Sequence, residues 1–193
     1  MPVEYMCGST DVTMQLLNEL SGVMKELPDG IKMCYIKTLT NAWATSSRYH
    51  ESKIHQCLFG CACVLVRPPR PHKPNLEISI TTPPPSLKKD SLRHYLYCNP
   101  LWAVIQEVSG FSCGPLEQAP IDRLGIRNPS VRCIFQLALA FRVYHATKND
   151  YLTKVLTAQR LGDYSEVRSI LKKLAAFHWK EIDPGQRVCG LAP

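Results

Sequence analysis

The spacing of hydrophobic residues at the start of the chain predicts an amphipathic helix. Within residues 11–27, apolar side chains recur every three to four positions, the spacing that places them on one face of a helix. Asp11 is suited to cap the first turn, and Pro28 is suited to end the helix. The apolar positions are Val12, Leu16, Leu20, Val23 and Leu27.

Three segments after this helix have the composition of β-strands. Residues 31–40 are rich in branched and aromatic side chains, and residues 56–66 form the apolar run QCLFGCACVLV. Residues 75–82 alternate apolar and polar positions, as expected of a half-buried strand. These segments predict a small antiparallel three-stranded meander.

The pattern changes to a helical period after the prolines at positions 83–85. Ser86 or Asp90 can cap a segment that runs to Tyr97. Asn99-Pro100 and Asn128-Pro129 each place Pro after a capping Asn, where its missing N–H costs nothing, so each predicts the start of a helix. The second of these helices, at about 129–148, is apolar on most sides and is therefore expected at the centre of the core.

The last part of the chain predicts two helices that are broken at Gly162. Asp163 and Glu166 form a pair of the capping-box type, and Asp183-Pro184-Gly185 ends the second helix. The order of elements predicts an α+β fold in one compact domain over residues 1–193. In this fold, residues 1–85 hold the first helix and the sheet, and residues 86–193 form a helical half.

The charge of the chain favours an anionic partner. Lys and Arg number 23 against 16 Asp and Glu, a net charge of +7 over 193 residues. Such a balance attracts polyanions at long range, although a basic surface can also serve solubility alone. The candidate contacts are Arg67, Arg70, Lys73, Arg168, Lys172 and Lys173.

The first three of these residues lie in the segment RPPRPHKP. Its four prolines favour an extended polyproline II conformation that displays the basic side chains. The segment also fits the pattern read by aromatic-lined, proline-binding domains, so a proline-reading partner is an alternative to a polyanion or a plain connection.

Nine cysteines, an odd number, indicate a chain of reduced thiols. The N-terminus lacks the basic start and apolar run of a secretory signal, and no apolar run approaches the roughly 20 residues that span a bilayer. We therefore expect a cytoplasmic or nuclear protein that is neither secreted nor membrane-spanning.

Two groups of residues are candidates for zinc or for cysteine chemistry. The first is the cluster His50, His55, Cys57, Cys61 and Cys63, and the second is the pair His94 and Cys98. In the first group, an extended strand would spread the thiols along one face, so the spacing favours buried strand residues over a metal site. In the second, residues four apart face the same way on a helix, but no oxyanion-hole signature accompanies them.

The sequence therefore favours a non-enzymatic binding or assembly protein without a cofactor. Its ligand would be a nucleic-acid backbone or an acidic protein or membrane surface, and homo-oligomers are compatible with this role. This compact, basic, thiol-rich profile is similar to that of small viral matrix or accessory proteins, a likeness of profile rather than of motif. The alternative is a zinc-binding protein or a cysteine-histidine enzyme built on His94 and Cys98 or on residues 50–63.

Overall fold

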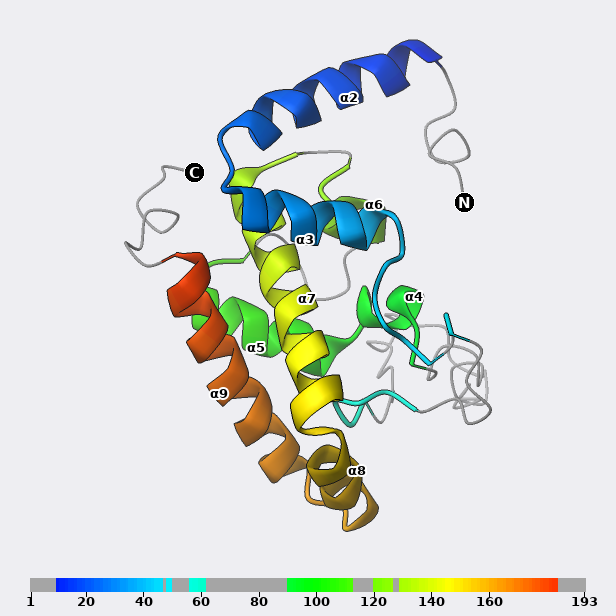
Figure 1. Ribbon diagram of the computed structural model, residues 1–193, viewed down its shortest axis with the longest axis vertical. Helices are drawn as coiled ribbons and strands as arrows, with labels where there is room; N and C mark the ends of the chain where they lie inside the picture. The colour runs from blue at the N-terminus through cyan, green and yellow to red at the C-terminus, as the bar shows by residue number, and fades with distance from the viewer. Residues whose placement is uncertain are drawn as a thin grey trace, which may run out of the picture.

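The described part of the chain is helical. The computed structural model describes residues 10–46, 48–49, 56–61, 90–112, 120–126 and 129–183. Figure 1 shows the arrangement of the helices in these residues. In chain order they are α2 (Thr10–Lys25), α3 (Asp29–Leu39), α4 (Leu92–Tyr95), α5 (Asn99–Ser109), α6 (Pro120–Arg123), α7 (Val131–Asp150), α8 (Leu152–Arg160) and α9 (Tyr164–Ile182).

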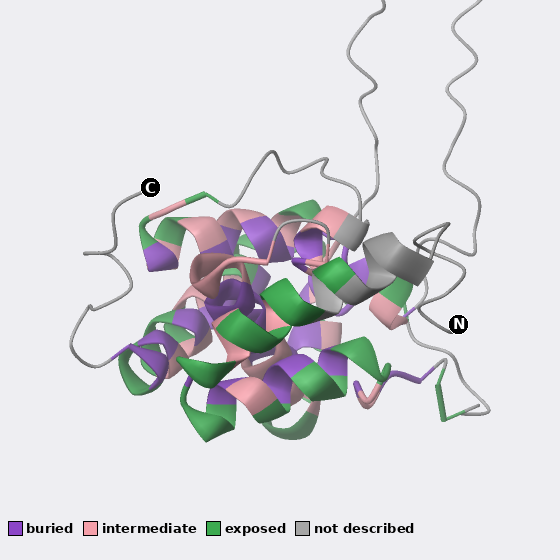
Figure 2. Ribbon diagram, turned by 90° about the horizontal axis from the view of Figure 1, so that it is seen from above, coloured by how far each residue is buried: buried purple, intermediate pink, exposed green. Residues whose placement is uncertain are grey.

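Helix α7 is the central element, as its sequence predicted. It contacts α3, α5, α8 and α9, and α5 also packs against α9. Figure 2 shows the buried residues on the facing sides of the helices and the exposed residues on their outer sides. The prediction of a central helix at about 129–148 is therefore confirmed, although the cap is Ser130, whose hydroxyl accepts a hydrogen bond from the N–H of Cys133.

The prediction of an α+β fold is wrong, because the described residues contain no sheet. Residues 31–40, predicted as the first strand, belong to α3. Its buried residues Ile31, Cys34, Tyr35 and Thr38 follow a helical period, and this period outweighs their high strand propensity. Pro28, expected only to end α2, is the N-cap of α3.

The other two predicted strands have different outcomes. Residues 56–61, the described part of the second strand, form a turn between Cys57 and Cys61 instead. The third predicted strand, residues 75–82, lies outside the described residues.

Three other helix predictions agree with the structure. The amphipathic helix predicted at 11–27 is α2, and a helix begins at Asn99-Pro100, although its N-cap is Cys98 rather than Asn99. The break at Gly162 lies between α8 and α9, where Gly162 has a φ of 72°. Asp163 caps α9 by accepting a hydrogen bond from the N–H of Glu166 at 3.0 Å.

A buried carboxylate joins three parts of the chain. Asp90 is fully buried and accepts hydrogen bonds from the N–H of Ser46 at 2.7 Å and from the hydroxyls of Tyr95 and Tyr144 at 2.7 and 3.0 Å. The ammonium of Lys148 lies 3.6 Å from the carboxylate. These contacts connect the loop after α3 to α4 and to α7.

Aromatic rings pack around this carboxylate. The rings of Tyr95 and Tyr144 have their centroids 4.8 Å apart, and Trp43 lies 5.0 Å from Tyr144 and 5.9 Å from Tyr95. All three side chains are almost completely buried. Because the rings exclude water, the hydrogen bonds to Asp90 form in a low-dielectric environment, where losing one of them is costly.

Among the described helices, none combines the length and the apolar character that are required to cross a bilayer.

Replacing Asp90 is expected to destabilise the protein strongly. Asp90→Ala removes the acceptor of three buried donors and the carboxylate that lies 3.6 Å from the ammonium of Lys148. Removing one partner of a buried ion pair lowers the free energy of unfolding by about 3–5 kcal/mol. Urea denaturation measures this change. The control is Asp29→Ala, which removes an ion pair between Lys32 and a 97% exposed side chain and should change stability by less than about 1 kcal/mol. Equal effects of the two substitutions would contradict the role assigned to Asp90.

Candidate metal centre

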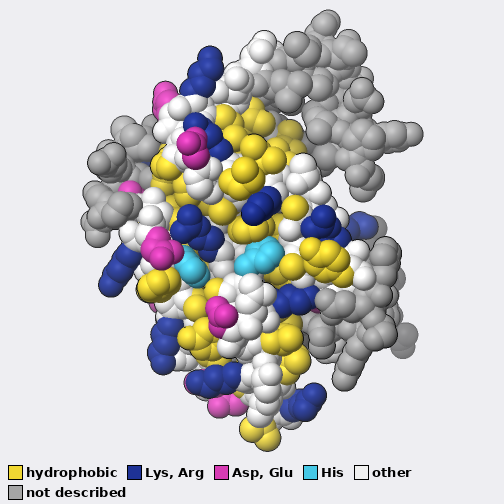
Figure 3. All heavy atoms as spheres, in the orientation of Figure 1, with side chains coloured by type: hydrophobic (Ala, Val, Ile, Leu, Met, Phe, Trp, Pro, Cys, Tyr) yellow, Lys and Arg dark blue, Asp and Glu magenta, His cyan; other side chains and the backbone are white. Residues whose placement is uncertain are grey.

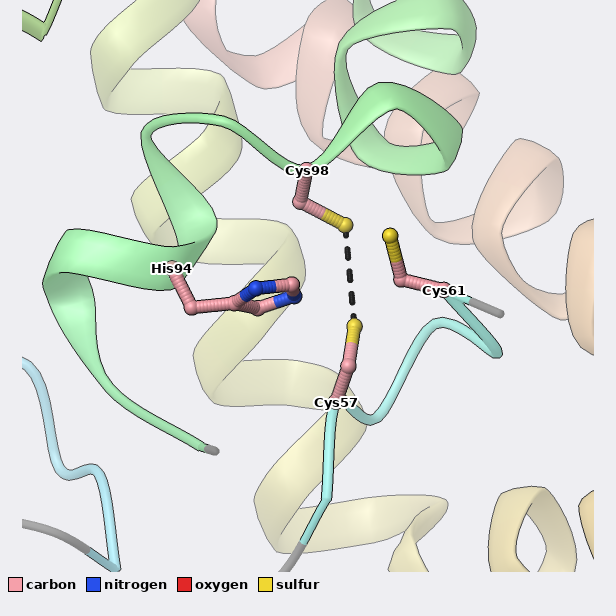
Figure 4. A group of neighbouring side chains, drawn as sticks. All are labelled: Cys57, Cys61, His94 and Cys98. Atoms are coloured by element: carbon pink, nitrogen blue, oxygen red, sulfur yellow. Dashed lines mark hydrogen bonds between the residues drawn. The ribbon is translucent and has the colours of Figure 1, made fainter. Parts of the chain in front are cut away.

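Three thiols and one imidazole converge in the interior of the protein. One ligand atom from each of Cys57, Cys61, His94 and Cys98 lies within 4.8 Å of the corresponding atom of every other member. Figure 4 shows the four side chains pointing toward a common centre. We call these four residues the Cys₃His cluster.

The four ligands come from two segments that are far apart in the sequence. Cys57 and Cys61 lie at the two ends of the turn formed by residues 57–61. His94 lies in the short helix α4, and Cys98 is the N-cap of α5. The His94-x₃-Cys98 pair was predicted on one continuous helix, but it lies at the junction of two helices, which still brings both side chains to the same side (Figure 4).

Gly60 makes the turn between Cys57 and Cys61. It adopts a left-handed conformation with a φ of 66°, and its N–H donates to the carbonyl of Cys57 at 3.4 Å. The ring of Tyr164 lies over it, so closely that a Cβ atom at position 60 would lie 2.5 Å from a ring carbon. Only glycine satisfies both the conformation and this close approach.

The cluster is largely buried. Cys57 and His94 are each 3% exposed and Cys98 is fully buried, whereas Cys61 is partly exposed. The Nε2 atom of His94 is buried and has no hydrogen-bond partner among the described residues. An unsatisfied buried ring nitrogen is costly in a protein interior, and a metal ion bound to it would remove this cost.

The sulfur atoms of Cys57 and Cys98 are 3.6 Å apart. This separation is far longer than the roughly 2.05 Å of a disulfide bond. It is close to the edge of about 3.8 Å expected for two thiolates on a tetrahedral zinc ion with Zn–S bonds of about 2.3 Å. The spacing of these two sulfurs therefore suits two thiolates that bind one metal.

The cluster contains a thiol that favours its charged form. Burial raises the pKa of Cys57, but hydrogen bonds from Cys61 and Cys98 and from the N–H groups of Phe59 and Cys61 outweigh burial and hold this pKa well below its usual value. Burial raises the pKa of Cys98 well above its usual value, and its hydrogen bonds and charge interactions with Cys57 and Cys61 raise it further. The thiol donors around Cys57 therefore favour its ionised form, and a bound cation would favour ionisation of the other thiols.

A second set of residues holds the turn in place. The side-chain amide of Gln159 in α8 donates to the carbonyls of Cys57 and Leu58 at 3.0 and 2.7 Å. The N–H of Leu58 donates to the hydroxyl of Tyr95 at 3.3 Å, and this hydroxyl donates to Asp90. The same Asp90 carboxylate that organises the core therefore also positions the turn.

The structure brings together residues from the two candidate groups that the sequence suggested separately. Cys57 and Cys61 from the first group meet His94 and Cys98 of the second. The expectation that the thiols spread along a strand is wrong, because Gly60 turns the chain between Cys57 and Cys61. His50, His55 and Cys63 lie outside the described residues.

The predicted basic contacts are only partly described. Arg67, Arg70 and Lys73 lie outside the described residues. Arg168 and Lys172 both form ion pairs with Glu107, at 3.3 and 2.5 Å, and the structure leaves Lys173 exposed on α9.

Sequence reasoning missed the residues that support the cluster. Asp90 was considered only as a helix cap, and neither Tyr95 nor Gln159 carries a sequence signal for its role. Gly60 does carry one, since a glycine inside an apolar run indicates a turn or a close backbone approach. Recognising it would have suggested that Cys57 and Cys61 converge.

No protein-family model, curated protein or solved structure matches this chain, so its own chemistry carries the functional argument.

Replacing Gly60 is expected to weaken both the fold and the cluster. Gly60→Ala forces a side chain into the left-handed region, at a cost of about 1–2 kcal/mol of unfolding free energy, and displaces the ring of Tyr164. Gly22→Ala is the control, because Gly22 lies within α2 with nothing near its added Cβ, and this change should stabilise the helix by about 0.5–1 kcal/mol. Urea denaturation compares the two variants. A Gly60→Ala protein as stable as the unmodified chain would show that the turn does not need glycine.

Proposed function

We propose that this protein is a structural zinc-binding protein, in which the Cys₃His cluster holds one Zn²⁺ ion and the helical body serves a non-enzymatic binding or assembly role. The observation that carries the proposal is the convergence of four ligand atoms within 4.8 Å of one another, three of them from buried side chains. The basic composition supports a binding role for the rest of the molecule.

The donor set favours zinc over other metals. Thiolate and imidazole are the soft and borderline ligands that zinc takes, whereas magnesium and calcium require oxygen ligands. Three thiolates and one imidazole form one of the common sets of structural zinc sites, in which all four positions are filled by protein. The short spacing within each ligand pair, Cys-x₃-Cys and His-x₃-Cys, is compatible with this geometry.

The arrangement favours a structural over a catalytic zinc. A catalytic zinc uses three protein ligands and leaves a fourth position for water or substrate. Here four protein ligands are present, and three of them are almost completely buried. A substrate would therefore find neither an open coordination position nor an access route through Cys57, His94 and Cys98.

The alternative of a cysteine enzyme has less support. A nucleophilic cysteine is partly exposed and has a lowered pKa. Cys98, the partner that the sequence suggested for His94, is fully buried, and its pKa is raised. Cys57 has the lowered pKa but is only 3% exposed, so a substrate cannot reach it without a rearrangement.

A zinc ion in this position joins distant parts of the chain. Cys61 and His94 are separated by the stretch of sequence that contains the predicted basic segment Arg67–Lys73. Binding both to one ion fixes the two ends of this stretch against α4 and α5. Closing a long segment in this way stabilises the native state by restricting the unfolded chain.

Metal analysis of the purified full chain tests the proposal. We expect one zinc per chain by native mass spectrometry, and chelation should lower the free energy of unfolding by at least about 2.7 kcal/mol, the contribution of a ligand present at about 100 times its Kd. Cys61→Ser should lose most of the zinc. The matched control is Cys133→Ser, which changes a partly buried cysteine outside the cluster and should keep the metal.

Two outcomes would contradict the proposal. The first is a folded protein without stoichiometric metal, in which chelation leaves the stability unchanged. The second is equal metal loss in Cys61→Ser and Cys133→Ser, which would place the metal outside the Cys₃His cluster.

A further inference from the structure

Helix α9 exposes an aromatic side chain between two lysines. Phe177 is 59% exposed, and Lys173 and Lys180 lie four residues before and three residues after it, also exposed. Residues at these spacings share one face of a helix. Figure 3 shows Lys and Arg side chains and hydrophobic side chains side by side on the face of the molecule that it draws. We call Lys173, Phe177 and Lys180 the α9 stripe.

The two lysines of the α9 stripe are free to meet an anion. Neighbouring cations are already paired: Arg168 and Lys172 with Glu107, Lys154 with Glu166, and Arg142 with Glu181. Within the described ranges, neither Lys173 nor Lys180 has a carboxylate at ion-pair distance. Their positive charges therefore face solvent without a compensating acid, in a chain whose net charge is +7.

Phe177 has no role in the core. Helix α9 turns Val167, Ile170, Leu171, Ala175, Trp179 and Ile182 toward its neighbours, and these side chains are buried. Phe177 is outside this buried set: its ring contacts that of His178, with centroids 5.2 Å apart, and leaves apolar surface in water. A ring held outward on a rigid helix, with a cation one turn away on each side, resembles the stacking platforms of proteins that bind single strands.

We infer that the α9 stripe binds single-stranded nucleic acid, with a base stacked on Phe177 and phosphates held by Lys173 and Lys180. The two lysines are seven residues apart, which is about 10 Å along a helix, so they bracket a base stacked on the ring. A duplex presents its phosphates but keeps its base faces stacked, so it would use only the lysines. An acidic peptide or an anionic membrane would likewise use the charges but offers no flat base to the ring.

The α9 stripe shares no residue with the Cys₃His cluster. The sequence suggested contacts to the nucleic-acid backbone. Phe177 lies exposed between Lys173 and Lys180 on α9, and its ring offers a face on which a base can stack. Phosphate contacts and stacking are both tolerant of sequence, so we expect little base preference.

Fluorescence anisotropy with the full chain and a labelled oligothymidine tests the inference over a series of salt concentrations. Phe177→Ala should weaken binding by roughly 5- to 100-fold, and Phe177→Trp should retain it. Replacing Lys173 and Lys180 with Ala should reduce the slope of log K against log salt by about 1.4, since each phosphate contact to a single strand contributes about 0.7. The matched controls are Leu161→Ala, which removes a 78% exposed apolar side chain, and the double change of exposed Lys25 and Lys37 to Ala.

Inorganic polyphosphate distinguishes stacking from charge, because it has phosphates but no bases. The double lysine variant should bind it more weakly, whereas Phe177→Ala should bind it as the unmodified chain does. The inference is overturned if the chain does not bind oligothymidine at low salt, or if the variants and their controls bind it equally. Equal loss of polyphosphate and oligothymidine binding in Phe177→Ala would also overturn it, as would binding to phosphatidylserine vesicles but not to the oligonucleotide.

Discussion

The structure depends on the convergence of three thiols and one imidazole at one point, where Cys57, His94 and Cys98 are buried. A buried imidazole nitrogen without a partner and three neighbouring sulfurs are unfavourable as neutral groups and more unfavourable as a cluster of thiolates. A single divalent cation would remove both costs, because the imidazole nitrogen would donate its lone pair to the ion and the charge of the ion would compensate the thiolates. The turn at Gly60, the position of His94 in α4 and the use of Cys98 as the N-cap of α5 are all consistent with this requirement.

The Cys₃His cluster and the buried Asp90 carboxylate both help to position α4 and the turn at residues 57–61. Tyr95 belongs to both, since its hydroxyl donates to Asp90 and accepts a hydrogen bond from Leu58 in the turn. Its backbone carbonyl accepts a further bond from the indole of Trp102 in α5. The short helix α4 is too small to be stable alone. It is held by the carboxylate before it, by the cluster and by the core beneath it.

The helical half of the fold could be predicted from the sequence because its signals are local. The period of α7, the break at Gly162 and the cap at Asp163 each depend on residues within a few positions of one another. The first predicted strand was wrong because the β-branched and aromatic residues of α3 pack in the core at a helical spacing. This tertiary packing outweighs their intrinsic strand propensity.

The candidate site was only half predictable. All four ligands were recognised as candidates, but in two separate groups, since sequence spacing does not show that residues 57–61 and 94–98 meet. The prediction of an extended strand at residues 56–66 also left out the turn at Gly60, which brings Cys57 and Cys61 together. The exposure of Phe177 depends on which side of α9 faces the core. That side is determined by how α9 packs against α5, α7 and α8.

X-ray absorption at the zinc edge of the purified protein tests the central claim most directly, because it reports the atoms bound to the metal. The Cys₃His cluster predicts three sulfurs at about 2.3 Å and one nitrogen at about 2.0–2.1 Å. In His94→Cys, which replaces the imidazole with a fourth thiolate, the spectrum should change to four sulfurs at about 2.3 Å. A spectrum of the unmodified protein dominated by nitrogen and oxygen ligands would contradict the account.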